Sequence, residues 1–109
     1  MTSIDHEPIR ERDAASPSRP KLVFFVSETS GKSRRTEAFL AQVLQRRGNH
    51  TTFHLVRVDA DRRPDLARRF RIITIPTLLV LEAGRIRGRL SEPSGCRQIT
   101  ELLAPWLIT

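Results

Sequence analysis

Residues 30–33 read Ser30-Gly31-Lys32-Ser33 and place two hydroxyl groups and a cation in one short segment. The letters Gly-Lys-Ser also close the P-loop that holds nucleotide phosphates. A P-loop requires another glycine five positions before Gly31, and that position is Val26. The spacing therefore fails, and nucleotide hydrolysis is not expected.

The same segment is a candidate anion site, because Lys32, Arg34 and Arg35 lie at the start of a helix predicted to begin near Ser33. A helix start presents free N–H groups and the positive end of the helix dipole, and both attract phosphate, sulfate or a carboxylate. In the alternative interpretation, Ser30 or Ser33 only caps the helix while the cations extend into water. The sequence leaves both interpretations open.

Sulfur and imidazole groups are few: Cys96 is the one cysteine, and the histidines are His6, His50 and His54. A single cysteine permits neither an internal disulfide nor a multi-cysteine metal site. The histidines show no metal-ligand spacing, so no metal and no cofactor are expected. Cys96 is interpreted as a half-exposed cysteine, with a monothiol redox role, for instance with glutathione, as the alternative.

The apolar pattern predicts the elements that would position these groups, in the order β-α-β-α-β-β-α. Strands are predicted over residues 21–26, 53–59, 77–81 and 86–90. Helices are predicted over 34–47, from 61–64 onward with Leu66, Ala67 and Phe70 buried, and after a Ser94 cap. A helical crossover makes the first two strands parallel, and the Gly84 turn makes the last two antiparallel. The result is an α/β fold, a four-stranded mixed sheet flanked by helices on both faces.

The chain has 109 residues, the size of one small domain. Residues 1–20 contain three prolines and few apolar residues, which predicts a flexible N-terminal arm followed by a domain over 21–109. No apolar stretch approaches the ~20 residues of a membrane span, and the N-terminus lacks the apolar core of a secretory signal. With one cysteine, the expected compartment is the cytoplasm.

Positive charge is concentrated in the predicted domain, which carries 16 basic and 8 acidic residues, a net charge of +8. Of the 19 basic residues in the chain, 17 are arginine. The base composition of the genome explains this preference for arginine as well as a binding surface does. Two groups stand out: one at Arg62, Arg63, Arg68, Arg69 and Arg71, and one at Arg85, Arg87 and Arg89, expected on one face of the last strand. Nucleic-acid surfaces interleave such charges with aromatic side chains, which are scarce here. A solvated basic face is the preferred interpretation.

The segment from Ile75 to Gly84 reads IPTLLVLEAG and resembles the thioredoxin family, in which an Ile-Pro-Thr segment with a cis proline precedes an apolar strand and a turn glycine. Residues 58–64 resemble the family's strand followed by Asp-x-x-Pro. Residues 22–34 align without gaps on the segment that carries the family's Cys-Gly-Pro-Cys motif. The resemblance covers residues 22 to about 104 and implies a thioredoxin-like fold.

The resemblance also identifies departures from the family pattern. Ser30-Gly31-Lys32-Ser33 stand where the family has Cys-Gly-Pro-Cys, and disulfide exchange needs both sulfurs. Phe24 replaces the family's buried aspartate, Thr29 its tryptophan and Glu92 its groove glycine. The chain is therefore not expected to be a dithiol oxidoreductase, nor an enzyme of another kind.

The resemblance also implies a candidate binding groove, formed by Thr29, Ile75, Pro76, Thr77 and Glu92. In the family this loop pairs its main chain with an extended peptide, a mode that needs no cysteine. Alternatively, the cis proline is kept only for its turn geometry. We expect a redox-inactive thioredoxin-like protein that acts as a protein-binding, scaffold or chaperone-like module, with an acidic or extended protein segment as partner and no membrane. The alternatives are the monothiol factor and a basic nucleic-acid-associated protein.

Overall fold

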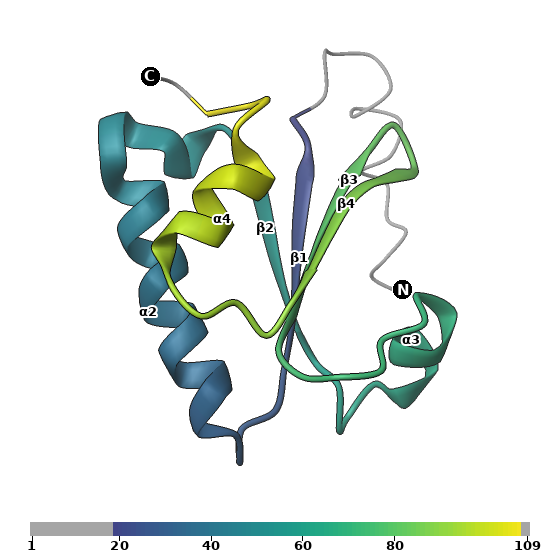
Figure 1. Cartoon of the computed structure of the whole chain (residues 1–109). Coiled ribbons are helices and arrows are strands. Elements are labelled where there is room, and N and C mark those ends of the chain that lie inside the picture. The colour runs from purple at the N-terminus through teal and green to yellow at the C-terminus, as the bar shows by residue number, and fades with distance from the viewer. Residues whose placement is uncertain (1–18, 108–109) are drawn as a thin grey trace.

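A computed structural model describes residues 19–107, in which one four-stranded sheet lies between two helical layers (Figure 1). The strands are β1 (Lys21–Val26), β2 (His54–Asp59), β3 (Thr77–Glu82) and β4 (Arg85–Ser91). The helices are α2 (Gly31–Gln45), α3 (Pro64–Arg69) and α4 (Cys96–Leu103), with a 3₁₀ segment, η2 (Arg46–Thr51), after α2. This order confirms the predicted β-α-β-α-β-β-α arrangement.

The sheet order is β2-β1-β3-β4, so β1 is paired along both of its edges. It runs parallel to β2 and antiparallel to β3, and β3 runs antiparallel to β4, as predicted. A strand covered on both faces reads as a continuous apolar run, which explains the sequence Leu-Val-Phe-Phe-Val that follows Lys21. Five of the six residues of β1 are buried.

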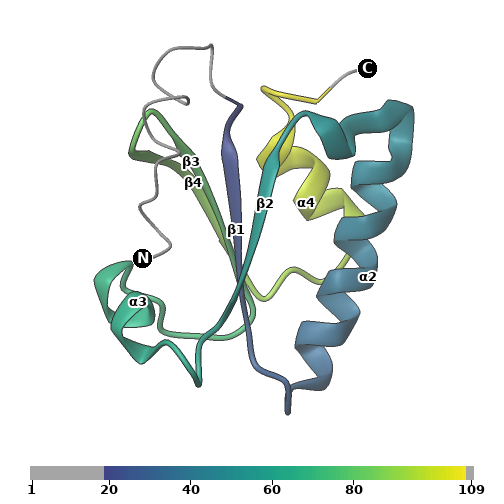
Figure 2. The same ribbon diagram turned by 180° about the vertical axis from the view of Figure 1, so that it is seen from behind.

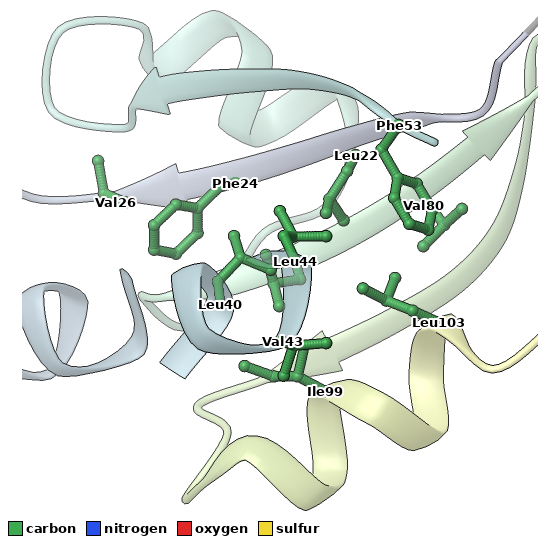
Figure 3. Packing of buried hydrophobic residues seen from close by; sticks show 11 residues of the cluster. Leu22, Phe24, Val26, Leu40, Val43, Leu44, Phe53, Val80, Ile99 and Leu103 are labelled. Atoms are coloured by element: carbon green, nitrogen blue, oxygen red, sulfur yellow. The ribbon is translucent and has the colours of Figure 1, made fainter. Parts of the chain in front are cut away.

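Alternate residues of β1 build two separate cores. Leu22, Phe24 and Val26 pack with apolar residues of α2 and α4 on one face (Figure 3). Val23 and Phe25 pack on the other face, against the half-buried Leu66 and Phe70 that α3 and its C-cap supply. Figure 2 shows the same division from behind, with α2 and α4 on one side of the sheet and α3 on the other. Helices thus cover both faces, as the pattern predicts.

Two predicted helix starts are wrong. Helix α2 begins at Gly31 rather than near Ser33 or at Arg34, because Ser30 is its N-cap. Helix α4 begins at Cys96 with Gly95 as N-cap, so Ser94 does not cap it. Instead, Ser94 lies one residue before the N-cap. Its backbone N–H and its hydroxyl lie 2.6 and 3.2 Å from the side-chain Oε1 of Gln98.

The expected arginine row on the last strand is also wrong. The pairing of β3 with β4 shifts register between Val80 and Leu81, which interrupts the alternation of side chains. Arg87 pairs with Glu82 at 3.0 Å, and the same carboxylate accepts a hydrogen bond from Trp106 at 3.2 Å. Arg89 instead reaches the carbonyls that end α3.

The predicted arm lies mostly outside the described residues, which begin at Arg19. Its last two residues contact the domain. The Pro20 carbonyl accepts the His54 N–H at 2.9 Å, and the Arg19 guanidinium donates to the Thr51 carbonyl at 3.2 Å.

Candidate functional site

Three loops meet at one end of the sheet, the lower end in Figure 1. One precedes α2, one precedes β3 and contains Pro76, and one follows β4 and contains Glu92. Strands β1 and β4 run in the same direction and both end there. Strand β3 lies between them, runs in the opposite direction and begins there. The Glu92 N–H donates to the Pro76 carbonyl at 2.8 Å, and the Lys32 ammonium pairs with the Glu92 carboxylate at 3.0 Å. Glu92, in the loop after β4, is thus joined to the loop before β3 and to the first turn of α2.

The two serines at the start of α2 have local structural contacts. The Ser30 hydroxyl oxygen accepts the Ser33 N–H at 3.1 Å and caps the helix. The Ser33 side chain is only 2% exposed, and its oxygen accepts the Ser27 N–H at 3.1 Å. Both oxygens therefore satisfy backbone donors of the loop and of the first helical turn.

The three cations expected to share an anion site do not share one position. Lys32 and Arg35 line the same surface hollow, whereas Arg34 is absent from its lining residues. A Cβ atom on Gly31 would lie 4.0 Å from the Arg34 guanidinium, so that side chain extends toward the helix start. Lys32 is already engaged with Glu92.

The predicted groove residues lie around the loop before β3. Pro76 follows a cis peptide bond and is buried, as is Thr77, while Ile75 is half-buried. The Thr77 hydroxyl donates to the Thr74 carbonyl at 2.7 Å and fixes the loop. Thr29, in the loop before α2, is exposed, with its hydroxyl 3.0 Å from that of Ser27.

Asp61, which the sequence pattern predicts only as a helix start, is a neighbour of this region. The Ser27 hydroxyl donates to its carboxylate at 2.7 Å. Because β1 and β2 are parallel, the residues that follow the two strands emerge at the same end of the sheet. The predicted parallel pairing could therefore have indicated that Ser27 and Asp61 lie close together. Thr36, in α2, has no comparable sequence signal because it occupies an ordinary helical position.

Cys96 is the first residue of α4, directly after the loop that follows β4. Its sulfur is 3.0 Å from the Gln42 side-chain oxygen and 3.7 Å from the Phe39 carbonyl. At 1.5 Å of rise per residue, these partners stand roughly 9 to 14 Å along α2 from Ser33. The thiol and the start of α2 therefore belong to different parts of the surface.

The arginines around α3 have contacts of their own. Arg63 and Asp65 form a two-point hydrogen-bonded pair at 3.1 and 3.0 Å, which raises the pKa of Arg63 and lowers the pKa of Asp65. The Arg69 guanidinium lies over the Phe70 ring at 5.9 Å, and Arg62 pairs with Asp59 at 3.8 Å. These pairs are local to this region.

A family model described as thioredoxin matches residues 10–105 of the chain. The chain belongs to the thioredoxin family. The match begins inside the segment predicted to be an arm. With Cys96 as its single cysteine, this thioredoxin-like protein has no dithiol pair, and no helix among the described residues is long and apolar enough to cross a membrane.

Individual relatives and structures agree with the family. The thioredoxin of Mycolicibacterium smegmatis is 27% identical over 95 residues, covering 84% of this chain and 85% of that protein. A thioredoxin of Mycobacterium tuberculosis is 26% identical over 95 residues, covering 84% and 80%. Among solved structures, the germline-specific thioredoxin Deadhead of Drosophila melanogaster has a TM-score of 0.74 at 16% identity, covering 98% of this chain and all of that one. Fasciola hepatica thioredoxin has a TM-score of 0.72 at 15% identity, covering 91% of both chains. At these identities the structures establish the fold alone.

Proposed function

We propose that this protein is a redox-inactive member of the thioredoxin family that binds an extended, acidic segment of another protein along the loop before β3. In this proposal Ser30-Gly31-Lys32-Ser33 replace the family's Cys-Gly-Pro-Cys. Serine does not take part in disulfide exchange, because its hydroxyl is scarcely ionised at neutral pH and forms no S–S bond. The one sulfur present, at Cys96, contacts the side of α2 rather than these loops.

The observation that carries the proposal is the main chain of Ile75. No hydrogen bond joins its N–H or its C=O to another of the residues 19–107. An extended peptide laid beside this loop would pair with both groups, as in the addition of a strand to a sheet edge. The neighbouring contacts Thr77–Thr74 and Glu92–Pro76 hold the loop in position, so little ordering is required when a peptide binds.

Two further features support a protein ligand. Ile73, two residues before Ile75, is 91% exposed, the most exposed of the large apolar side chains in the described part of the chain. It offers an apolar contact beside the free main chain. The domain as a whole has a net charge of +8, and this charge favours an acidic segment.

The test is selection of ligands from a random peptide library, followed by titration of each selected peptide into labelled protein. We expect shifts of the amide resonances of residues 29–32, 73–75, 77 and 91–92. Ile73→Asp should weaken binding by about tenfold, which equals about 1.4 kcal/mol. Ile86→Asp is the matched control, because Ile86 is also exposed (45%) but lies on β4, and it should leave affinity unchanged. Equal losses in both variants, or shifts confined to α3 and β4, would overturn the proposal.

A further inference from the structure

Beside the Lys32–Glu92 pair lies a hollow of about 230 Å³ between α2 and the segment that follows β4. Its lining residues come from these two elements: Lys32, Arg35, Thr36, Glu92, Pro93 and Ser94. The backbone of Glu92 is bonded to the Pro76 carbonyl, so the hollow adjoins the proposed peptide-binding loop. A ligand running along that loop can therefore place one side chain in it.

Thr36 is the unusual member of the lining. The residue is 2% exposed, yet its hydroxyl forms no hydrogen bond with any of the residues 19–107. Buried hydroxyls nearly always have a partner, because a polar group removed from water without one is costly. In many helices a threonine bonds back to the carbonyl four residues earlier, as Thr100 does to Cys96 at 2.9 Å. Thr36 does not, which leaves a donor for a ligand oxygen at the hollow.

The charged residues that line the hollow favour a ligand with a single negative charge. Lys32 and Arg35 contribute two positive charges and Glu92 one negative charge, so the net charge is +1. Arg35 has no ion pair with another residue in the described part of the chain, whereas Lys32 is paired with Glu92. One carboxylate would neutralise the hollow, and the planar guanidinium of Arg35 suits carboxylate geometry. A phosphate dianion would exceed the available charge and face the Glu92 carboxylate.

We propose that this hollow binds a single carboxylate, the side chain of an aspartate or glutamate in the bound segment. Arg35 pairs with the carboxylate, and the Thr36 hydroxyl donates a hydrogen bond to it. The inference rests on the proposed peptide-binding function. It assigns the preference for an acidic segment to the pairing of Arg35 with one carboxylate of that segment.

The first experiment uses N-acetyl-glutamate N-methylamide, which carries one carboxylate, and N-acetyl-glutamine N-methylamide, its neutral isostere. Each is titrated at constant ionic strength while the amide resonances of residues 32–36, 92 and 94 are followed. We expect saturable shifts with the glutamate compound only. Equal responses to both compounds, or tighter binding of inorganic phosphate than of the glutamate compound, would overturn the proposal.

Matched variants locate the site. Arg35→Gln and Thr36→Val should each reduce the affinity for the glutamate compound by about fivefold or more, in the range expected for a charge-assisted hydrogen bond. Arg34→Gln removes the same charge from the adjacent residue outside the hollow and should change affinity by less than about twofold. Equal losses for Arg34→Gln and Arg35→Gln would mean that only the general positive charge matters. Thr36→Val conserves shape and removes an unbonded hydroxyl, so the variant is expected to fold.

A second experiment separates this inference from the proposed function. In a peptide selected for binding to the loop before β3, each glutamate or aspartate is replaced by its amide. One replacement should weaken binding in the native protein and have no effect in the Arg35→Gln variant. If the peptide binds through Ile73 but no such replacement matters, the carboxylate site is wrong while the peptide-binding function stands.

Discussion

Glu92 connects the candidate site in two ways, through its backbone and through its carboxylate. Its N–H reaches the Pro76 carbonyl, and its side chain pairs with Lys32. Its backbone has φ of 46°, in the left-handed region that glycine adopts most easily. The resemblance places the family's groove glycine at this position. The carboxylate therefore comes with a backbone conformation that disfavours any side chain.

The residue-scale prediction compares two variants that both lack the carboxylate. Glu92→Gly should be more stable than Glu92→Ala by about 1 kcal/mol, because a non-glycine residue in the left-handed region costs roughly 1–2 kcal/mol. Urea denaturation of both proteins measures the difference. At ordinary positions glycine is the less stable of the two, so the usual order at position 92 would contradict the assigned backbone geometry.

At the scale of elements, α3 is short and is stabilised from outside. It spans only Pro64–Arg69, and Arg71, just beyond its C-cap Phe70, has φ of 56°. Arg89 of β4 donates to the Phe70 carbonyl at 2.7 Å and to the Arg71 carbonyl at 3.2 Å. A cation at this end complements the negative end of the helix dipole. Part of the arginine content therefore fixes the position of a helix.

We expect Arg89→Ala to lower the free energy of unfolding by about 1 kcal/mol, the net contribution of charge-assisted hydrogen bonds at an exposed position. Arg85→Ala is the control, because Arg85 lies on the same strand and forms no hydrogen bond or ion pair through its side chain with residues 19–107. It should cost about 0.5 kcal/mol at most. Hydrogen exchange at α3 should rise only in Arg89→Ala. An equal response in both variants would count against the capping role.

At the scale of the whole molecule, the fold is kept while the sulfur chemistry is reduced to one cysteine. Phe24 is 1% exposed and lies in the core between the sheet and α2 (Figure 3). By resemblance this is the position of the family's buried aspartate. An apolar ring there contributes to packing and has no proton to transfer.

The whole-molecule prediction is an absence of disulfide reductase activity. Insulin reduction with dithiothreitol should proceed at the rate of the buffer blank. The double variant Ser30→Cys with Ser33→Cys should restore weak activity at most, because Phe24 and Lys32 remain. Turnover in the native protein that disappears in Cys96→Ser would instead support the monothiol alternative.

The order of elements follows from the sequence alone. The run after Lys21 is apolar at consecutive positions, which predicts a strand buried on both faces, and β1 is that strand. Helical spacing of Leu40, Val43 and Leu44 predicts α2, and all three are buried. These features depend on local periodicity and on which residues leave water. Periodicity and burial can both be predicted from neighbouring residues in the sequence, without knowledge of contacts between distant residues.

The composition of the site was decided by tertiary contacts. Three adjacent cations carry equal charge in the sequence, yet Lys32 pairs with Glu92, Arg35 lines the hollow and Arg34 does neither. Their separation depends on where a loop 60 residues later along the chain is positioned. The place of Thr36 in the hollow likewise emerges only when the segment after β4 is placed against α2. Local patterns determine which residues are buried, whereas partners distant in sequence determine which polar groups remain unsatisfied.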